Sequence, residues 1–432
     1  KAQFKALLDK GVSLVDPAAR HAVYQQFNQL YYDLAVGIPV VLATSHGYEQ
    51  KWIENRVLNP IFSGEYYAPM EKTGGADPTT IVNASMGDTD TLDPALAYDT
   101  ASGEIIQNVY ETLVFYDGIA TDKFLPQLAD SWTVSDDGTV WTFHIREGVK
   151  FHAGGDLTPS DVAYSFERGL LQGGYSSPQW LLAEPFFGVG MDDITGLVDE
   201  FASADSRETL IANPADKLVA ACETVKSKFV VDDAAGTVTM TLAQPWGPFL
   251  ATIAQTWGSI MDEQWVVENG GWDGSCDTWQ NYYAMVSADN PFSPIANGTG
   301  PYMLDHWTPG EETVLTRFDG YWGTPAKTER VAIKIISEFG TRFAMLQAGE
   351  ADFIDVPVEQ RPQVDEMVGE IAIYDPETNM YKAPVPVCSV NVDLLGLDRF
   401  EICDTPNDMP LTLYYGRPGL SQDVLIYNFL VE

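Results

Sequence analysis

Basic residues are scarce in this 432-residue sequence, which has 24 lysines and arginines against 62 aspartates and glutamates. The formal net charge of −38 would repel a nucleic-acid backbone or an anionic membrane surface, so nucleic-acid binding is not expected. Long apolar runs are missing as well. The longest stretch, residues 34–43, is broken by Gly37 and Pro39 and falls short of the roughly 20 residues that span a bilayer. We therefore expect a chain that folds in water.

Cysteine is also rare, and its spacing argues against a metal site. The four cysteines form no C-x-x-C pair and have no histidine nearby at zinc spacing. The four cysteines form either two disulfides or four buried, unreactive thiols. We favour the bridges Cys222–Cys276 and Cys388–Cys403 because an exported protein tolerates them. The acidic run at residues 88–93 lacks the glycine and the distal glutamate of a calcium loop. No metal and no cofactor is expected.

Strings typical of common enzymes are absent too. The sequence contains no G-x-S-x-G, no H-E-x-x-H and no Walker or dinucleotide loop. Gly188-Val-Gly190 is not followed by the third glycine of a dinucleotide loop, because Asp193 stands there. The five histidines are scattered and are expected to be structural. These negatives favour a binding protein over an enzyme, and we expect no catalytic residues.

What the chain does have is a large apolar share, 45%, which is enough for the core of two or three domains. Asp16 followed by proline predicts a helix over residues 16–34, and Thr158 with Asp161 predicts a second capped helix. Alternating apolar residues on either side of a turn predict hairpins at residues 131–145 and 229–242. Interspersed helices and strands indicate a mixed α/β fold.

Several aromatic residues stand in or near loops rather than in a clean core period. Flat aromatic faces in such places suit stacking on peptide side chains or sugar rings, although packing in the core or an interface is the first explanation for any single one of them. They are Tyr98, Tyr175, Trp180, Trp246, Trp257, Trp307 and Trp322.

Three stretches carry a resemblance to a known family. Residues 124–170 read FLPQLADSWTVSDDGTVWTFHIREGVKFHAGGDLTPSDVAYSFERGL, and residues 297–357 include NGTGPYMLDHWTPGEETVLTRFDGYWG and TRFAMLQAGEADFIDVP. A third match runs from Leu92-Asp-Pro94 to residues 108–114, NVYETLV. In order and spacing these stretches resemble the family 5 extracellular solute-binding proteins, the peptide, nickel and oligosaccharide receptors of ABC importers. The matches cover nearly all of residues 77–391.

The order of the segments is unusual for that family. Residues 1–38 resemble the carboxyl-end part of lobe II, and residues 39–72 resemble the segment that returns to lobe I. A junction at 73–78 precedes lobe I with its extra subdomain at 79–385, and a hinge with a partial lobe II follows at 386–432. We interpret the chain as circularly permuted, or as a sequence whose segments are rearranged and incomplete. The sequence does not begin with a signal peptide, so we expect that one was removed or is not included in the sequence.

The resemblance implies a two-lobed clamshell of the type II periplasmic-binding-protein class, with lobe II incomplete. It implies a monomer that binds an oligopeptide or similar small solute between its lobes and presents it to an ABC transporter permease. The location would be periplasmic or at the cell surface, with membrane contact only through a lost lipid anchor. Alternatives are an oligosaccharide receptor, a secreted scaffold or chaperone, and a secreted hydrolase that shares the scaffold.

Family positions suggest which residues face the ligand. Tyr98 precedes Tyr110 in the family's first loop, Trp180 follows the helix after the signature, and Trp257 follows the second hairpin. We expect these three to line the cleft, with Tyr175 behind them. An aspartate in lobe II usually holds the amino group of a bound peptide, and no matching segment occurs here.

Overall fold

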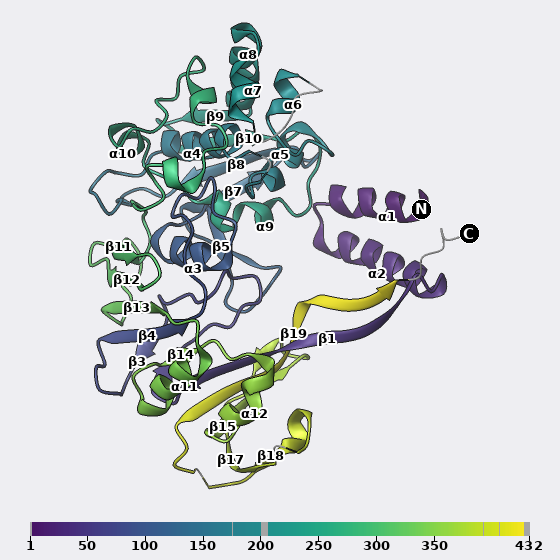
Figure 1. The fold of residues 1–432 in the computed structure, drawn as a ribbon. Helices are drawn as coiled ribbons and strands as arrows, with labels where there is room; N and C mark the ends of the chain where they lie inside the picture. The colour runs from purple at the N-terminus through teal and green to yellow at the C-terminus, as the bar shows by residue number, and fades with distance from the viewer. Residues whose placement is uncertain (1, 175, 200–205, 392, 406, 427–432) are drawn as a thin grey trace.

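The computed structural model describes residues 2–174, 176–199, 206–391, 393–405 and 407–426. Three main sheets, with helices packed against them, form the mixed α/β architecture that the sequence predicts (Figure 1). The buried apolar side chains form two clusters. The larger lies within the upper part of the molecule, and the smaller surrounds the lowest sheet. Two separate cores are what a two-lobed fold requires.

The upper sheet is built from the two predicted hairpins, both of which are confirmed. Its strands follow the order β7-β8-β10-β9, and all neighbours are antiparallel. Gly138 makes the first turn with a φ of 74°, which glycine adopts without strain. The four strands are β7 (Ala129–Val134), β8 (Val140–Ile145), β9 (Phe229–Asp232) and β10 (Thr237–Thr241).

Helices surround this sheet, and the longest of them is the predicted capped helix α4 (Pro159–Gln172). The Thr158 side chain accepts from the main-chain N–H of Asp161, and the Asp161 carboxylate accepts in return from the N–H of Thr158, so the capping box is confirmed. The other helices here are α3 (Thr100–Val109), α5 (Trp180–Phe187), α6 (Thr195–Val198), α7 (Arg207–Ile211), α8 (Ala215–Lys226), α9 (Phe249–Ile253) and α10 (Glu263–Glu268). Short 3₁₀ turns lie at Thr256–Gly258, Trp279–Asn281 and Ser287–Asp289. The short strands β5 (Val114–Tyr116) and β6 (Phe124–Pro126) pair beside α3.

The middle sheet joins the two cores. Its order is β11-β12-β13-β4-β14, and β4 pairs in parallel with both β13 and β14. Ile81 on β4 belongs to the upper core and Ala84 to the lower one, so this strand contributes to both. The strands are β4 (Thr80–Ser85), β11 (Tyr302–Thr308), β12 (Glu312–Arg317), β13 (Arg330–Ile335) and β14 (Phe353–Ile354), and helix α11 (Phe339–Ala348) precedes the last of them.

The lowest sheet brings together strands that are far apart in the sequence. Its order is β1-β19-β15-β17-β18, and the short β16 also pairs antiparallel with β15. The 14-residue β1 pairs antiparallel with the 16-residue β19, and β15 pairs in parallel with β19. The strands are β1 (Gly37–Gln50), β15 (Val368–Asp375), β16 (Met380–Tyr381), β17 (Val385–Val390), β18 (Phe400–Ile402) and β19 (Leu411–Ile426). Near it lie α12 (Arg361–Asp365) and 3₁₀ turns at Val358–Gln360 and Gly396–Arg399.

This sheet therefore draws strands from the three segments predicted at 39–72, 79–385 and 386–432. The lobe boundaries and the permuted order stay predictions. Two short strands, β2 (Ile53–Glu54) and β3 (Glu71–Lys72), lead from β1 back to the middle sheet.

Two helices precede β1, namely α1 (Ala2–Ser13) and α2 (Pro17–Asp33). The predicted cap of α2 is confirmed, since the Asp16 carboxylate accepts from Ala19 N at 2.7 Å. The end of α1 contacts the upper body, where Gly247 N donates to Val12 O at 2.6 Å. Figure 1 shows β1 and β19 running side by side from the lowest sheet toward these helices. We call this two-stranded segment the β1–β19 ribbon.

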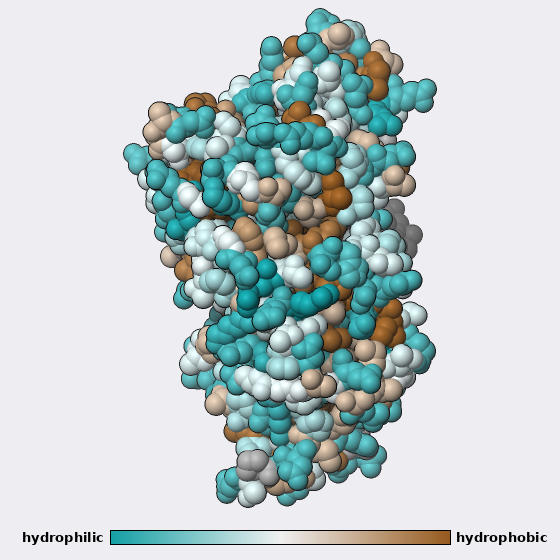
Figure 2. Space-filling model, turned by 90° about the vertical axis from the view of Figure 1, so that its left-hand side faces the viewer, coloured by the Kyte–Doolittle hydropathy of each residue, from teal (hydrophilic) through white to brown (hydrophobic). Residues whose placement is uncertain are grey.

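Cys222 forms a disulfide with Cys276, and Cys388 forms one with Cys403. The first joins α8 to the loop near residue 275, and the second ties β17 to the chain after β18. The face of the molecule in Figure 2 is covered mainly by hydrophilic residues, with apolar residues in small patches. No helix within the described residues has the length and apolarity to cross a membrane.

Candidate ligand-binding site

A pocket with a largely apolar wall lies against the β1–β19 ribbon. It has a volume of about 350 Å³ and is lined by residues 43–45 of β1, 417–419 of β19, and 57–60, 62 and 64–65 of the segment that leads to the upper body. We call it the ribbon pocket. Small-molecule sites are commonly concave, largely apolar and placed where parts of a fold meet, so this pocket is the candidate binding site.

A β-bulge shapes one wall of the ribbon pocket. Thr44 pairs with Pro418 and His46 with Tyr415, so a single residue of β1 lies opposite two residues of β19. One of these two is Gly416, whose φ of 94° is readily adopted by glycine. Bulges bend a strand and redirect its side chains, and this one accompanies Arg417 in the pocket wall.

Arg417 connects the ribbon to the upper body. Its side chain is buried, and its Nη1 donates to Leu58 O at 2.9 Å while its Nη2 donates to Ile119 O. Its main-chain N–H donates to Ser45 Oγ at 3.2 Å, and Ser45 Oγ lies 2.7 Å from Tyr381 Oη. These bonds hold β1, β19 and the 57–60 loop around the same cavity.

Asn59 fixes the loop on the other side of the pocket. Its Nδ2 donates to Gly118 O at 2.9 Å and to Ala120 O at 3.0 Å, and its Oδ1 accepts from Ile61 N at 3.0 Å. Phe62 then forms an apolar wall, with its ring stacked 5.1 Å from that of Phe115. The wall is therefore supported by the upper core.

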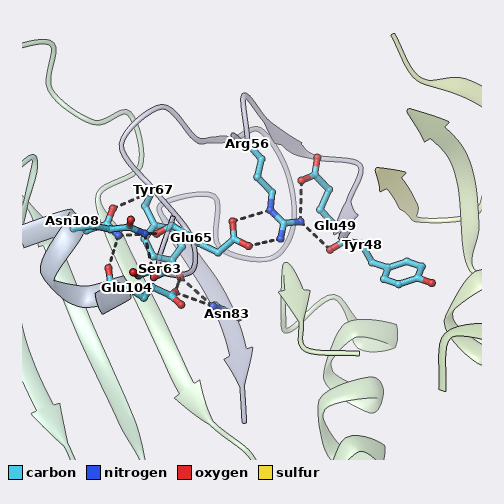
Figure 3. A network of polar contacts seen from close by, with 10 residues as sticks. Tyr48, Glu49, Arg56, Ser63, Glu65, Tyr67, Asn83, Glu104 and Asn108 are labelled. Atoms are coloured by element: carbon cyan, nitrogen blue, oxygen red, sulfur yellow. Dashed lines mark hydrogen bonds and ion pairs between the residues drawn. The ribbon is translucent and has the colours of Figure 1, made fainter. Parts of the chain in front are cut away.

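A polar network continues from Glu65, behind the pocket (Figure 3). The Arg56 guanidinium donates two bonds to the Glu65 carboxylate, one from Nε at 2.9 Å, and it also lies 3.4 Å from Glu49 Oε2. Burial raises the pKa of Glu49 to about 7, even though Arg56 lowers it. One cation is thus shared by two carboxyl groups.

The network reaches helix α3 through main-chain and side-chain bonds. Asn108 Nδ2 donates to Glu65 O at 2.8 Å, and Asn108 Oδ1 accepts from Tyr67 N at 2.9 Å. The Tyr67 hydroxyl donates to Glu104, and Asn83 Nδ2 donates to the same carboxyl oxygen at 3.1 Å. Burial raises the pKa of Glu104 to about 8. The pocket is therefore backed by a buried, hydrogen-bonded layer.

The predicted aromatic residues lie elsewhere. Tyr98 is 57% exposed, Trp180 begins α5, and Trp257 lies in the turn after α9. None of these three lines the ribbon pocket, and Tyr175 falls outside the described residues. Their role in the cleft stays a prediction.

Sequence reasoning did not select the residues that do line the pocket. The Gly416–Pro418 sequence and the Asn59–Pro60 pair were signals of irregular backbone, but they did not reveal that the two segments meet. The described residues contain no group of three or more potential ligands arranged to hold a metal ion.

Comparison with known proteins gives the family. The model of the bacterial extracellular solute-binding proteins, family 5 Middle, matches residues 123–383, which is more than half of the chain. The chain belongs to this family. The family 5 resemblance of the sequence is thereby confirmed, and the family is one of solute-binding proteins.

Family 5 relatives include two proteins of Escherichia coli K12. The dipeptide-binding protein is 28% identical over 294 residues, which cover 64% of this chain and 45% of the relative. The probable D,D-dipeptide-binding periplasmic protein DdpA is 30% identical over 285 residues, covering 65% and 44%. A solved structure of DppA from Helicobacter pylori with the peptide STSA is 24% identical, with a TM-score of 0.46 and coverage of 67% and 49%. The chain spans about half the length of the relatives it matches.

Proposed function

We propose that this family 5 chain binds a small solute, with short peptides as the favoured class, and presents it to the permease of an ABC importer. The proposal is carried by the ribbon pocket, whose walls come from the β1–β19 ribbon and from the segment bound to the upper body. A ligand that touches both walls would stabilise one relative arrangement of them, which a membrane partner could recognise.

The peptide class is supported by the relatives. Dipeptide binding is named for both proteins of Escherichia coli above. The pocket volume of about 350 Å³ suits a solute of dipeptide to tripeptide size, and its mixed lining suits a ligand with polar ends and an apolar side chain. A place in the periplasm or on the cell surface belongs to the same proposal.

Binding without turnover is also part of the proposal. The buried carboxyl groups beside the pocket are held by Arg56, Tyr67 and Asn83 in a closed set of hydrogen bonds. Carboxyl groups that are hydrogen-bonded in this way support the pocket walls and are not free to act as nucleophiles or bases toward a substrate. The competing hydrolase hypothesis predicts instead that a bound peptide is cleaved.

The test uses native mass spectrometry of the full chain with an equimolar library of dipeptides and tripeptides. We expect retained peptides of unchanged mass, and we expect Phe62→Ala to weaken their binding because a pocket wall is lost. Phe187→Ala is the matched control, since Phe187 is likewise half-buried in the upper body but lies outside the pocket. Failure to retain any peptide would refute the peptide class, and cleavage products would favour the hydrolase.

A further inference from the structure

The two disulfides of this chain differ in how far solvent reaches them. Cys222 is fully buried and Cys276 packs against the larger core, so their bridge lies inside the upper part of the molecule. Cys388, on β17, is exposed, whereas its partner Cys403 is half-buried. A thiolate must reach a sulfur atom before thiol–disulfide exchange can occur, so exposed bridges exchange faster than buried ones. Of the two bridges, Cys388–Cys403 is the one open to such attack.

A pocket of about 390 Å³ lies beside Cys388, at the lower end of the molecule in Figure 1. It is lined by residues 387–390 of β17, by residues 407–409 of the segment before β19, and by Glu366 and Val368. We call it the β17 pocket. Asn407 holds the segment in place, because its Nδ2 donates to Val387 O and its main-chain oxygen accepts from Lys51 Nζ at 3.3 Å. Cys403 is not part of this lining, so a thiol that enters the pocket meets Cys388 first.

The charged residues that line the β17 pocket are acidic. Glu366 and Asp408 are both exposed and both belong to the lining. A third carboxylate, that of Glu401 on β18, accepts from the Oγ of Ser389 at 2.6 Å, and Ser389 also lines the pocket. The cation of Lys51 supports the wall through Asn407 but is not part of the lining. A small thiol with a positive charge is therefore attracted to this pocket, and an anionic thiol is repelled.

We propose that Cys388 is a site of thiol–disulfide exchange for small cationic thiols that enter the β17 pocket. The incoming thiolate attacks Cys388 Sγ and forms a new sulfur–sulfur bond there. The bond between Cys388 and Cys403 breaks, and its electron pair leaves on Cys403 Sγ as a thiolate. The product is a mixed disulfide on Cys388 and a free thiol at Cys403, and the incoming thiol is the only reductant needed. This chemistry is independent of the solute that the ribbon pocket binds.

The first test treats the folded full chain with cysteamine, a small thiol that carries an ammonium group. Samples are quenched with acid, free thiols are blocked, and trypsin then separates the two cysteines because Arg399 lies between them. We expect the cysteamine adduct on Cys388 and the released thiol on Cys403. The Cys222–Cys276 bridge is the internal control and should exchange at least about tenfold more slowly. Equal exchange of both bridges, an adduct mainly on Cys403, or no exchange at Cys388–Cys403 overturns the inference.

The second test asks whether the carboxylates of the β17 pocket select the thiol. Cysteamine, 2-mercaptoethanol and mercaptoacetate differ in charge, and the rate of each is divided by its rate with oxidised dithiothreitol to remove differences in intrinsic reactivity. We expect the cation to exceed the anion by about tenfold at low salt, and by less in about 1 M KCl. Glu366→Gln with Asp408→Asn should remove most of that difference.

The matched control for the second test is Glu147→Gln with Asp136→Asn, which removes two exposed carboxylates from the upper body and should leave the difference unchanged. Loss of the preference in the pocket variant alone supports the inference. A wild type without preference for the cation, or the same preference in the pocket variant as in the wild type, overturns it.

Discussion

Glu104→Gln should flatten the dependence of stability on pH. Glu104 on α3 lies in a buried position that raises its pKa from 4.5 to about 8, with Glu65 and Asp355 adding to the effect of burial. The carboxyl oxygen Oε1 accepts from Tyr67 and Asn83. Glutamine keeps that acceptor and the shape of the side chain but cannot ionise. The variant should therefore fold and lose only the pH-dependent contribution of this carboxyl group.

The sign follows from proton linkage. With a folded pKa above the unfolded one, the folded state holds the proton that the unfolded state releases between pH 4.5 and pH 8. The contribution of Glu104 to stability is therefore complete below pH 4.5 and is lost as the pH rises through 8. At about 1.4 kcal/mol per pH unit, the loss between pH 5 and pH 8 is about 4 kcal/mol.

Urea unfolding at pH 5, 6, 7 and 8 measures this contribution as the difference between wild type and variant. Taking the difference removes the titration of other groups, among them His46 and His152, whose burial lowers the pKa of each to about 4 and gives the opposite trend. Glu147→Gln, at an exposed position, is the matched control and should leave the profile unchanged. Parallel profiles of wild type and Glu104→Gln would refute the reasoning.

Three further predictions concern stability. Cys222→Ser with Cys276→Ser should lower the free energy of unfolding by about 4 kcal/mol, because the 54-residue separation sets the lost loop constraint, and calorimetry against the oxidised wild type checks this. Arg168→Met should cost about 3–5 kcal/mol in urea unfolding, because Asp93 then stays buried without its partner, and a loss below 1 kcal/mol would contradict that. Asn59→Ala should cost about 1–3 kcal/mol by removing the bonds to the carbonyls of Gly118 and Ala120, and thermal unfolding at fixed pH measures it.

Local features of the fold could be predicted from the sequence because their causes are local. The cap of α2 depends on Asp16 and the proline after it, and the capping box of α4 depends on Thr158 and Asp161. The hairpin turn at Gly138 likewise depends on neighbours in the chain. Such features need no knowledge of what the segment contacts in the folded protein.

The pairing of distant strands could not be predicted in the same way. β1 and β19 are separated by more than 350 residues, and either strand could satisfy its main-chain groups with another partner. The family resemblance predicted the solute-binding class but offered no match for β19 beyond a weak likeness to lobe II. The parallel pairing of β15 with β19 joins segments that the sequence assigned to different lobes.

The same separation explains why the ribbon pocket was missed. The bulge at Gly416 is set by register shifts against β1, and the position of Arg417 depends on carbonyls of Leu58 and Ile119 in two other segments. An arginine in a strand is ordinary in sequence, and its bonds to two distant segments exist only in the folded chain. Loop aromatics drew attention because their residue type is unusual, whereas Arg417 is informative only through the segments that it connects.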